Sequence, residues 1–386
     1  MSEVKNILIT TYFFYPTNNP RAFRITALAK KLASKGHKVT VITADLGFNY
    51  EQYKTENNID IITIKTGYLL NPPKMVKHTT NQTLTISGKQ SPLKSGLKTF
   101  IRKCIRYFLP AGHVFEYSIS LARYLKKIEI NNYDVIISNS HPFAVHLGTA
   151  IGMGKFNNIS IAESGDPYYY NHYKIAPYQK WIEVWALSKF TYITIPVDNA
   201  ISDYKKLNMD DKAVVIPHGF DFENVELNEV NQSKKVEFAF AGRLYKDIRN
   251  PTSFLNYLVN YKSNCDFRLT IYTDFKNQET KDILSPFIEI LGDKLKIYDL
   301  IPREDCIKQL SSANFLINFT NDTKNQTPSK LIDYTLTKRP FISIGTTFDN
   351  TSEFENFFNK NFSEFNAPDI SRFNINNICR EFEKLF

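Results

Sequence analysis

At 386 residues the chain is too long for one ordinary core, and its 42% hydrophobic and 14% aromatic residues are enough for two. No apolar run approaches the ~20 residues of a membrane-spanning helix, which excludes that class. The formal net charge of +9 predicts an anionic partner. Nucleic acid, an acidic membrane surface and a phosphorylated small substrate all fit that charge.

The cysteines and the N-terminus indicate the compartment. Four cysteines lie far apart, without a Cys-x-x-Cys pair or a histidine at metal-ligand spacing: Cys104, Cys265, Cys306 and Cys379. Such scattered thiols are typical of free cysteines in a reducing compartment. The N-terminus leads directly into a strand, without the apolar segment of a signal peptide. We therefore expect a cytoplasmic protein, or one peripheral on the inner face of the cell membrane.

The first half of the chain alternates strands with helices. Residues 6–11 and 38–43 are short apolar strands, and residues 21–35 between them have helical apolar spacing. A strand, a crossover helix and a second strand open a doubly wound, Rossmann-like domain. Further strands are expected at 60–65, 133–138, 159–162 and 192–195, and a long loop at 68–92.

The second half repeats this order after a polar linker at 223–235. A strand closed by a turn is expected just before this linker, at 214–221, and further strands are expected after it at 238–241, 268–272, 294–298, 315–319 and 341–344. Helical apolar spacing returns at 370–386. The pattern predicts an α/β protein with two parallel-sheet domains. We place the domains at 1–222 and 223–366, followed by a C-terminal helical segment at 367–386.

Two stretches carry groups suited to a nucleotide. Residues 236–251 are a buried strand, the turn residue Gly242 and three cations: Arg243, Lys246 and Arg249. Such cations suit a diphosphate. In the second stretch, residues 325–340, Thr327 and Pro328 are typical of a helix N-terminus, whose first amides, at Ser329 and Lys330, point at an anion. Asp333, one turn into that helix, suits the hydroxyls of a ribose.

With these residues the chain resembles the GT-B glycosyltransferases and, among them, glycosyltransferase family 4. The resemblance spans most of the chain and is strongest over 236–345. It implies two Rossmann-like domains facing a cleft, with a terminal helix crossing back to the first domain. It also implies a nucleoside-diphosphate-sugar donor, a glycan or lipid-linked acceptor, retention of anomeric configuration, and a role in bacterial surface polysaccharide synthesis, such as lipopolysaccharide or capsule. No cofactor or metal is expected, because no Asp-x-Asp pair lies in a suitable loop.

The resemblance assigns site residues one by one. Arg243, with Lys246 and Arg249, would bind the donor diphosphate, and Asp333 would bind the ribose. Where the family carries two glutamates with seven residues between them, this chain has Asn325 and Asp333, so the first charge is lost.

In the first domain the catalytic candidates are His141 and Asp166, each in a loop after a strand. A structural histidine and a turn-capping acid are the alternatives. Arg21 and Arg24, at the start of the first helix, are candidates for an acceptor phosphate.

Residues 93–109 combine an apolar helical stripe with five cations: Lys94, Lys98, Arg102, Lys103 and Arg106. That composition suits an interfacial helix on anionic lipid, and equally an ordinary helix with its basic face in water.

Two other functions remain open. One is a nucleotide-sugar 2-epimerase, which binds the same donors on the same fold. The other is a basic membrane- or nucleic-acid-binding protein without catalysis, conceivable because of Asn325. No stacked-aromatic basic motif of an RNA-binding protein is present, so nucleic acid is not the expected partner.

Overall fold

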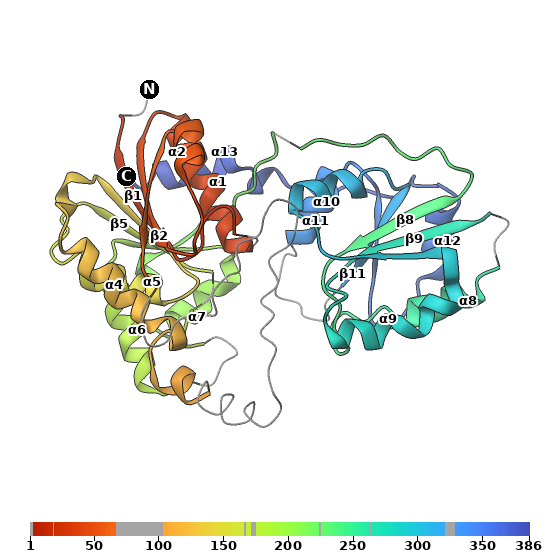
Figure 1. The fold of residues 1–386 in the computed structure, drawn as a ribbon, viewed down its shortest axis with the longest axis horizontal. Helices are drawn as coiled ribbons and strands as arrows, with labels where there is room; N and C mark the ends of the chain where they lie inside the picture. Colours follow the sequence, from red (N-terminus) through yellow and green to blue (C-terminus); the bar gives the residue numbers. More distant parts are fainter. Residues whose placement is uncertain are drawn as a thin grey trace. The chain divides into compact units, whose positions relative to one another are not determined.

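The structure, a computed structural model, describes residues 3–17, 19–66, 103–165, 167–170, 175–223, 225–262, 265–320 and 329–386. The chain forms two compact units, each with one parallel β-sheet (Figure 1). Unit 1 comprises Met1–Asp221 and Arg372–Phe386, and unit 2 comprises Phe222–Ser371. The α/β class is confirmed.

Unit 1 contains a seven-stranded sheet in the order β3-β2-β1-β4-β5-β6-β7, with every pair parallel. Its strands are β1 (Asn6–Thr10), β2 (Lys38–Ala44), β3 (Ile59–Ile64), β4 (Val135–Asn139), β5 (Ile159–Glu163), β6 (Tyr192–Ile195) and β7 (Ala213–Val215). The strand expected at 214–221 is confined to β7, which ends at Val215, and the other strands expected in this half of the chain lie within two residues of their expected bounds. Short apolar runs of this kind, buried on both faces, are typical of parallel sheets.

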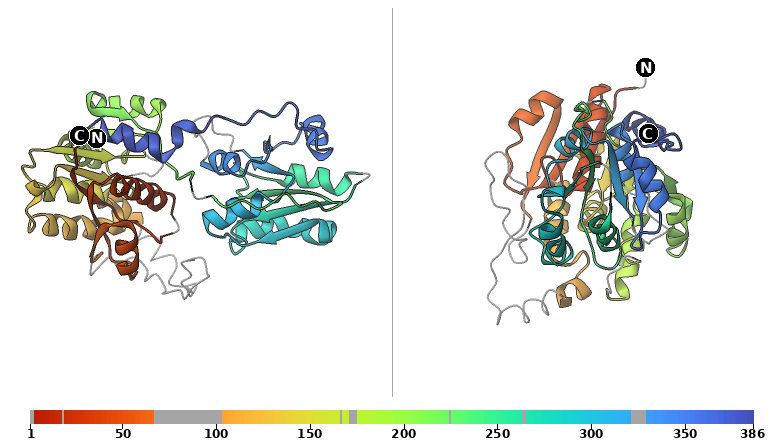
Figure 2. Two further views of the ribbon diagram at one scale, coloured as in Figure 1. Left: turned by 90° about the horizontal axis from the view of Figure 1, so that it is seen from above. Right: turned by 90° about the vertical axis from the view of Figure 1, so that its right-hand side faces the viewer.

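Side chains alternate between the two faces of this sheet. Ile7 and Val135 pack against α1 (Pro20–Ser34), α2 (Glu51–Asn57) and α13 (Ile375–Glu383). Leu8 and Ile136 pack toward α4 (Phe115–Leu125), α5 (Ala144–Gly152), α6 (Tyr178–Ser188) and α7 (Ile201–Lys205) (Figure 1). The left view of Figure 2 shows α13, in dark blue, within unit 1, where it contacts α1.

Unit 2 contains a five-stranded parallel sheet in the order β10-β9-β8-β11-β12. Its strands are β8 (Val236–Ala241), β9 (Phe267–Tyr272), β10 (Leu295–Tyr298), β11 (Phe315–Phe319) and β12 (Phe341–Ile344). Its helices are α8 (Thr252–Asn260), α9 (Gln278–Leu291), α10 (Arg303–Leu310), α11 (Ser329–Leu336) and α12 (Thr351–Phe358). One face of the sheet packs in a core that is rich in phenylalanine, where the rings of Phe238 and Phe315 stack with their centroids 5.0 Å apart. The other face packs beneath α10 and α11 through Ala239, Leu316 and Tyr334.

Short 3-10 segments complete the description: Gly112–Val114, Ile130–Asn132, Asp198–Ala200, Asp210–Lys212, Gly292–Lys294 and Ser371–Phe373. Within the described ranges, no helix has both the length and the apolar character needed to cross a membrane.

Candidate functional site

The candidate donor site in unit 2 begins at the carboxyl end of β8. Gly242 follows this strand with a φ of +140°, which side-chain-bearing residues rarely adopt. A Cβ atom at this position would lie 2.5 Å from Nζ of Lys330. Glycine is thus required here for the backbone conformation and for the space that the lysine amine fills.

Lys330 lies in the first turn of α11, and its amine is enclosed by protein. Nζ lies 4.1 Å from the centroid of the Phe240 ring, and it has no hydrogen-bond partner among the residues that the structure describes. Burial lowers the pKa of Lys330 well below its usual value, and the charge of Arg249 lowers it further. A desolvated cation without a hydrogen-bonding partner is a group that an anionic ligand would satisfy.

The loop after Gly242 folds back as a short hairpin. The backbone N–H groups of Tyr245 and Arg249 donate to each other's carbonyl oxygens at 3.1 and 3.2 Å. Nη1 of Arg249 donates to the carbonyl oxygen of Arg243 at 3.2 Å, and burial lowers the pKa of Arg249. The hairpin therefore brings the Arg249 charge toward Lys330, while the Arg243 side chain is exposed.

Lys246, the third predicted cation of this loop, faces α9. Its backbone N–H donates to Oε1 of Glu279 at 2.9 Å, and its Nζ lies 3.6 Å from Oδ2 of Asp282. Of the three cations expected at one place, Arg249 thus lies near Lys330, whereas Lys246 is paired with acids.

Asp333 forms an ion pair that the sequence did not reveal. Nε and Nη2 of Arg303 lie 2.8 and 2.6 Å from Oδ1 of Asp333. Burial raises the pKa of Asp333, and Arg303 acts in the opposite direction. Arg303 is the first residue of α10 and follows β10 closely. Its place beyond the carboxyl end of a strand is the sequence signal that could have indicated a site residue.

The position of α11 is fixed by Tyr334, which is buried. Its hydroxyl donates to the carbonyl oxygen of Ile317 at 2.9 Å and accepts from the backbone N–H of Ala241 at 3.1 Å. The first contact ties the helix to β11 and the second ties it to the end of β8. Tyr334 therefore holds Lys330 and Asp333 at the carboxyl edge of the sheet.

A second polar cluster lies at the carboxyl end of β5 in unit 1, around Glu163. Its carboxylate accepts a hydrogen bond from Nδ2 of Asn139, and its Oε1 lies 3.5 Å from Nδ1 of His218 and 3.9 Å from Nη1 of Arg21. Burial alone would raise the pKa of Glu163, but His218 and the arginines lower it to about 2. Burial lowers the pKa of His218 to about 4. At neutral pH the cluster thus holds an ionised carboxylate beside a neutral imidazole.

The arginines proposed for the acceptor lie in this cluster. Arg21 packs directly on Gly165, where a Cβ atom would lie 1.4 Å from Nη2 of the arginine. Arg24 lies with its guanidinium 6.0 Å from the centroid of the Phe220 ring and lines a small cavity shared with Glu163 and His218. Sequence reasoning missed Glu163 and His218. The signal for Glu163 was its place at the last residue of a parallel strand.

The two histidines after β4 have different environments. His141 is exposed, in the loop that leads to α5. His146 is buried between two hydroxyls, with Nδ1 2.8 Å from Oγ of Ser138 and Nε2 3.0 Å from Oγ of Ser164. Burial lowers the pKa of His146 to about 3, so this histidine is neutral and structural.

Several predicted features fall outside the described residues: Asp166, Asn325, the helix start at Thr327 and Pro328, and residues 93–102 of the basic segment. For Ser329 the structure gives its place as the first residue of α11. Within the described ranges, no group of three or more His, Cys, Asp or Glu side chains is placed to hold a metal ion.

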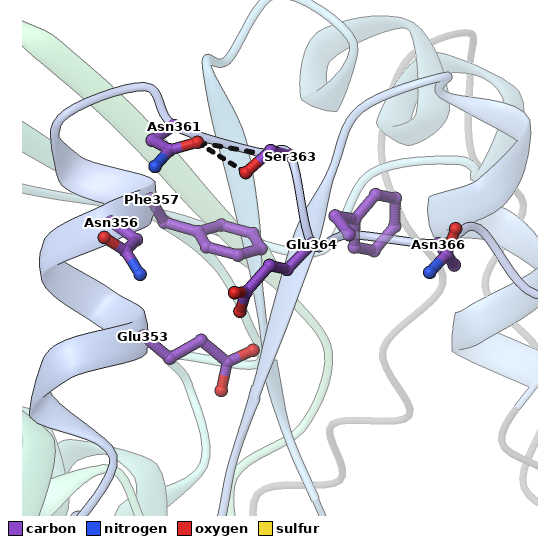
Figure 3. A pocket seen from close by; sticks show the side chains of 8 residues that line it. Glu353, Asn356, Phe357, Asn361, Ser363, Glu364 and Asn366 are labelled. Carbon is purple, nitrogen blue, oxygen red and sulfur yellow. Dashed lines mark hydrogen bonds between the residues drawn. The ribbon is translucent and has the colours of Figure 1, made fainter.

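Unit 2 also has a pocket of about 190 Å³ between α12 and the segment that follows it (Figure 3). The carboxylates of Glu353 and Glu364 face its interior, and Asn361 accepts hydrogen bonds from the backbone N–H and hydroxyl of Ser363. Two carboxylates repel a diphosphate, so this pocket is not the donor site.

Comparisons with known proteins agree with this architecture. The profile of Glycosyltransferase Family 4 matches residues 22–224. A structure of HepE from Anabaena in complex with UDP and glucose aligns with a TM-score of 0.59 at 10% identity, covering 98% of both chains. A glycosyltransferase from Rickettsia africae aligns with a TM-score of 0.58 at 12% identity, covering 99% of this chain and 98% of the other.

A UDP-N-acetylglucosamine 2-epimerase aligns with a TM-score of 0.55 at 10% identity, covering 98% of this chain and 94% of the other. No match was found among curated proteins. The GT-B fold with two Rossmann-like domains is thereby confirmed. Because the family profile matches more than half of its residues, the chain belongs to glycosyltransferase family 4, and it is a glycosyltransferase.

Proposed function

We propose that this enzyme transfers a sugar from a nucleoside-diphosphate sugar to a glycan or lipid-linked acceptor, with retention and without a metal ion or cofactor. One observation carries the proposal most directly. The amine of Lys330 is enclosed against Gly242, lacks a hydrogen-bond partner in the described part of the chain, and lies near Arg249. A diphosphate bound at this edge would supply the missing anion.

In this proposal the protein acts mainly by stabilising the leaving diphosphate. Lys330 and Arg249 would neutralise charge that develops on the diphosphate as the glycosidic bond breaks. The backbone amides of Ser329 and Lys330, at the N-terminal end of α11, and the exposed Arg243 would add donors. Lys246 would contribute only if it left Asp282. The donor's own phosphate would take the acceptor's proton, which accounts for retention without a protein nucleophile.

Asp333 is the proposed ligand of the ribose hydroxyls. Both close contacts from Arg303 are made to Oδ1, so Oδ2 is the oxygen available to a hydroxyl group. Arg303 keeps the carboxylate oriented and opposes the effect of burial on its pKa. Asn325, which stands where the family carries a glutamate, would contact the donor sugar through its amide.

On the acceptor side the proposal uses the groups of unit 1. His141 and Asp166 would face the reacting hydroxyl, and Arg21 and Arg24 would bind an acceptor phosphate. The Glu163 carboxylate would orient Arg21. A phosphate on the acceptor is consistent with a lipid-linked substrate, and residues 93–109 would hold the enzyme on the inner face of the membrane. Surface polysaccharide synthesis, such as that of lipopolysaccharide or capsule, is the pathway class proposed.

The second candidate function is nucleotide-sugar 2-epimerisation, since an epimerase shares the fold. An epimerase converts its donor without any acceptor and returns an intact nucleotide sugar. A transferase releases the nucleoside diphosphate instead.

Nucleotide binding tests the proposed donor site. Thermal unfolding would be measured with UDP, GDP, ADP and CMP, for the wild type and for Asp333→Ala. A ligand at about 100 times its dissociation constant adds about 2.7 kcal/mol of stability, so one diphosphate should raise the melting temperature. Asp333→Ala should lose this rise, and Asp293→Ala, which removes an exposed acid of the same unit, should keep it. If no nucleotide stabilises the wild type, the proposal fails.

A further inference from the structure

Both tryptophans of the chain are exposed on one helix, α6. Trp181 is 75% exposed and Trp185 is 44% exposed, and Tyr178, one turn before Trp181, is 37% exposed. Residues spaced by three and four lie on one face of a helix. Large aromatic side chains that gather on one exposed face indicate a binding surface rather than chance exposure.

The opposite face of α6 is buried and contains the only acid of the helix. Glu183 is turned into the core, where its carboxylate accepts hydrogen bonds from the backbone N–H groups of Tyr168 and Tyr169 at 2.6 and 2.8 Å. The charged side chains of α6 that reach solvent are those of Lys180, which is half-buried, and Lys189, which is exposed and caps the C-terminus of the helix. The exposed face is thus aromatic and basic, without a carboxylate of its own.

The end of the basic segment extends this face. Tyr107 and Phe108 are 37% and 57% exposed. The carbonyl oxygen of Tyr107 accepts hydrogen bonds from Nε2 of Gln179 at 2.5 Å and from the backbone N–H of Ala176 at 3.0 Å. The hydroxyl of Tyr178 donates to the carbonyl oxygen of Phe108.

These contacts join helical residues 103–108 to the start of α6. Lys103 and Arg106 of that segment are also exposed. We call the five aromatic residues Tyr107, Phe108, Tyr178, Trp181 and Trp185 the aromatic surface.

We propose that the aromatic surface inserts into the headgroup region of an anionic lipid bilayer. Tryptophan and tyrosine are favoured at that depth, because their rings are apolar and carry one polar group. Lysine and arginine beside them are attracted to anionic headgroups. This inference deepens the proposed function, since a lipid-linked acceptor resides at such a surface, and it adds α6 to the segment 93–109.

Self-association of the surface is the less favoured alternative. In a two-fold dimer the same patch meets itself, so the lysines and arginines around the aromatic surface would face their own copies. Like charges brought together in this way oppose association, whereas an anionic bilayer complements them.

Tryptophan fluorescence tests the proposal directly, because Trp181 and Trp185 are the only tryptophans. The full chain would be mixed with vesicles of phosphatidylcholine and phosphatidylglycerol whose acyl chains carry bromine, which quenches tryptophans that enter the bilayer. We expect a blue shift and quenching on these vesicles and little change on phosphatidylcholine alone. Binding without quenching would mean that residues 93–109 dock without α6, and it would overturn the inference.

Matched variants are compared by sedimentation with unbrominated vesicles. The double variant Trp181→Ser and Trp185→Ser should weaken vesicle binding by about tenfold or more. Tyr298→Ser, which removes an aromatic residue that is 51% exposed in unit 2, should not. If the wild type forms a dimer and does not bind vesicles, and the double variant is monomeric, the proposal is overturned in favour of self-association. The increase in melting temperature caused by a nucleoside diphosphate should be the same in the wild type and in all these variants. If the wild type itself shows no such increase, the proposed donor site fails, whatever the result with vesicles.

Discussion

Replacing Lys330 by methionine is expected to lower kcat/KM for sugar transfer by about 100- to 1,000-fold, the effect of removing one preorganised charge from a transition-state site. The same change should leave the protein as stable as the wild type, or more stable. The amine is desolvated against the Phe240 ring and has no hydrogen-bond partner among the described residues, so its charge opposes folding in the absence of ligand. Steady-state kinetics and thermal unfolding of the purified variant measure the two effects.

The combination of lost activity with retained stability distinguishes a binding role from a structural one. Lys308→Met is the control, because Lys308 lies on α10 in the same unit and pairs with Glu226 at the surface. It should keep both activity and stability. A Lys330→Met enzyme with nearly normal kcat/KM would show that this amine does not serve the donor, and one that unfolds would show that the amine has a structural role instead.

Replacing Glu163 by alanine is expected to destabilise unit 1 by about 3–5 kcal/mol, the usual cost of leaving a buried charge without its partner. The side chains of Glu163 and Arg21 are only 12% and 16% exposed, and Arg21 lies directly against Gly165. Urea unfolding followed by tryptophan fluorescence measures this effect, because both tryptophans lie in unit 1.

The pH dependence of that difference follows from the pKa of Glu163, which is lowered from 4.5 to about 2. An acid with a lowered pKa stabilises the fold above its unfolded pKa, and the contribution is lost as the pH falls through the folded value. The difference between variant and wild type should therefore be complete above pH 4.5 and shrink toward pH 2. Glu51→Ala, at an exposed pair with Lys54, should have little effect at any pH. A Glu163→Ala protein of wild-type stability at neutral pH would contradict this account.

The strands could be predicted from sequence because each is a short apolar run, a pattern that depends only on neighbouring residues. β8 and β11 are examples, since their phenylalanines are buried against α8, α9 and α12. The helix that carries Lys330 and Asp333 was predictable for a similar reason, because the apolar spacing of its residues is a local signal.

The partners of the site residues were not predictable, because they come from distant parts of the chain. Arg303 reaches Asp333 across 30 residues, and His218 reaches Glu163 across an even longer separation. The place of Lys246 depends in the same way on α9, whose Asp282 no local pattern connects to the Gly242 loop. Likewise, the exposure of Trp181 and Trp185 follows from which face of α6 packs on the core, which composition does not determine.

Release of nucleoside diphosphate from a panel of UDP-, GDP- and ADP-sugars tests the central claim most directly. The account predicts that donors of one base release their diphosphate, slowly to water and faster with a lipid-linked acceptor, and that Lys330→Met abolishes both. It also predicts that the transferred sugar keeps the anomeric configuration of the donor. Recovery of an intact nucleotide sugar inverted at C2, without free diphosphate, would contradict the account and identify an epimerase.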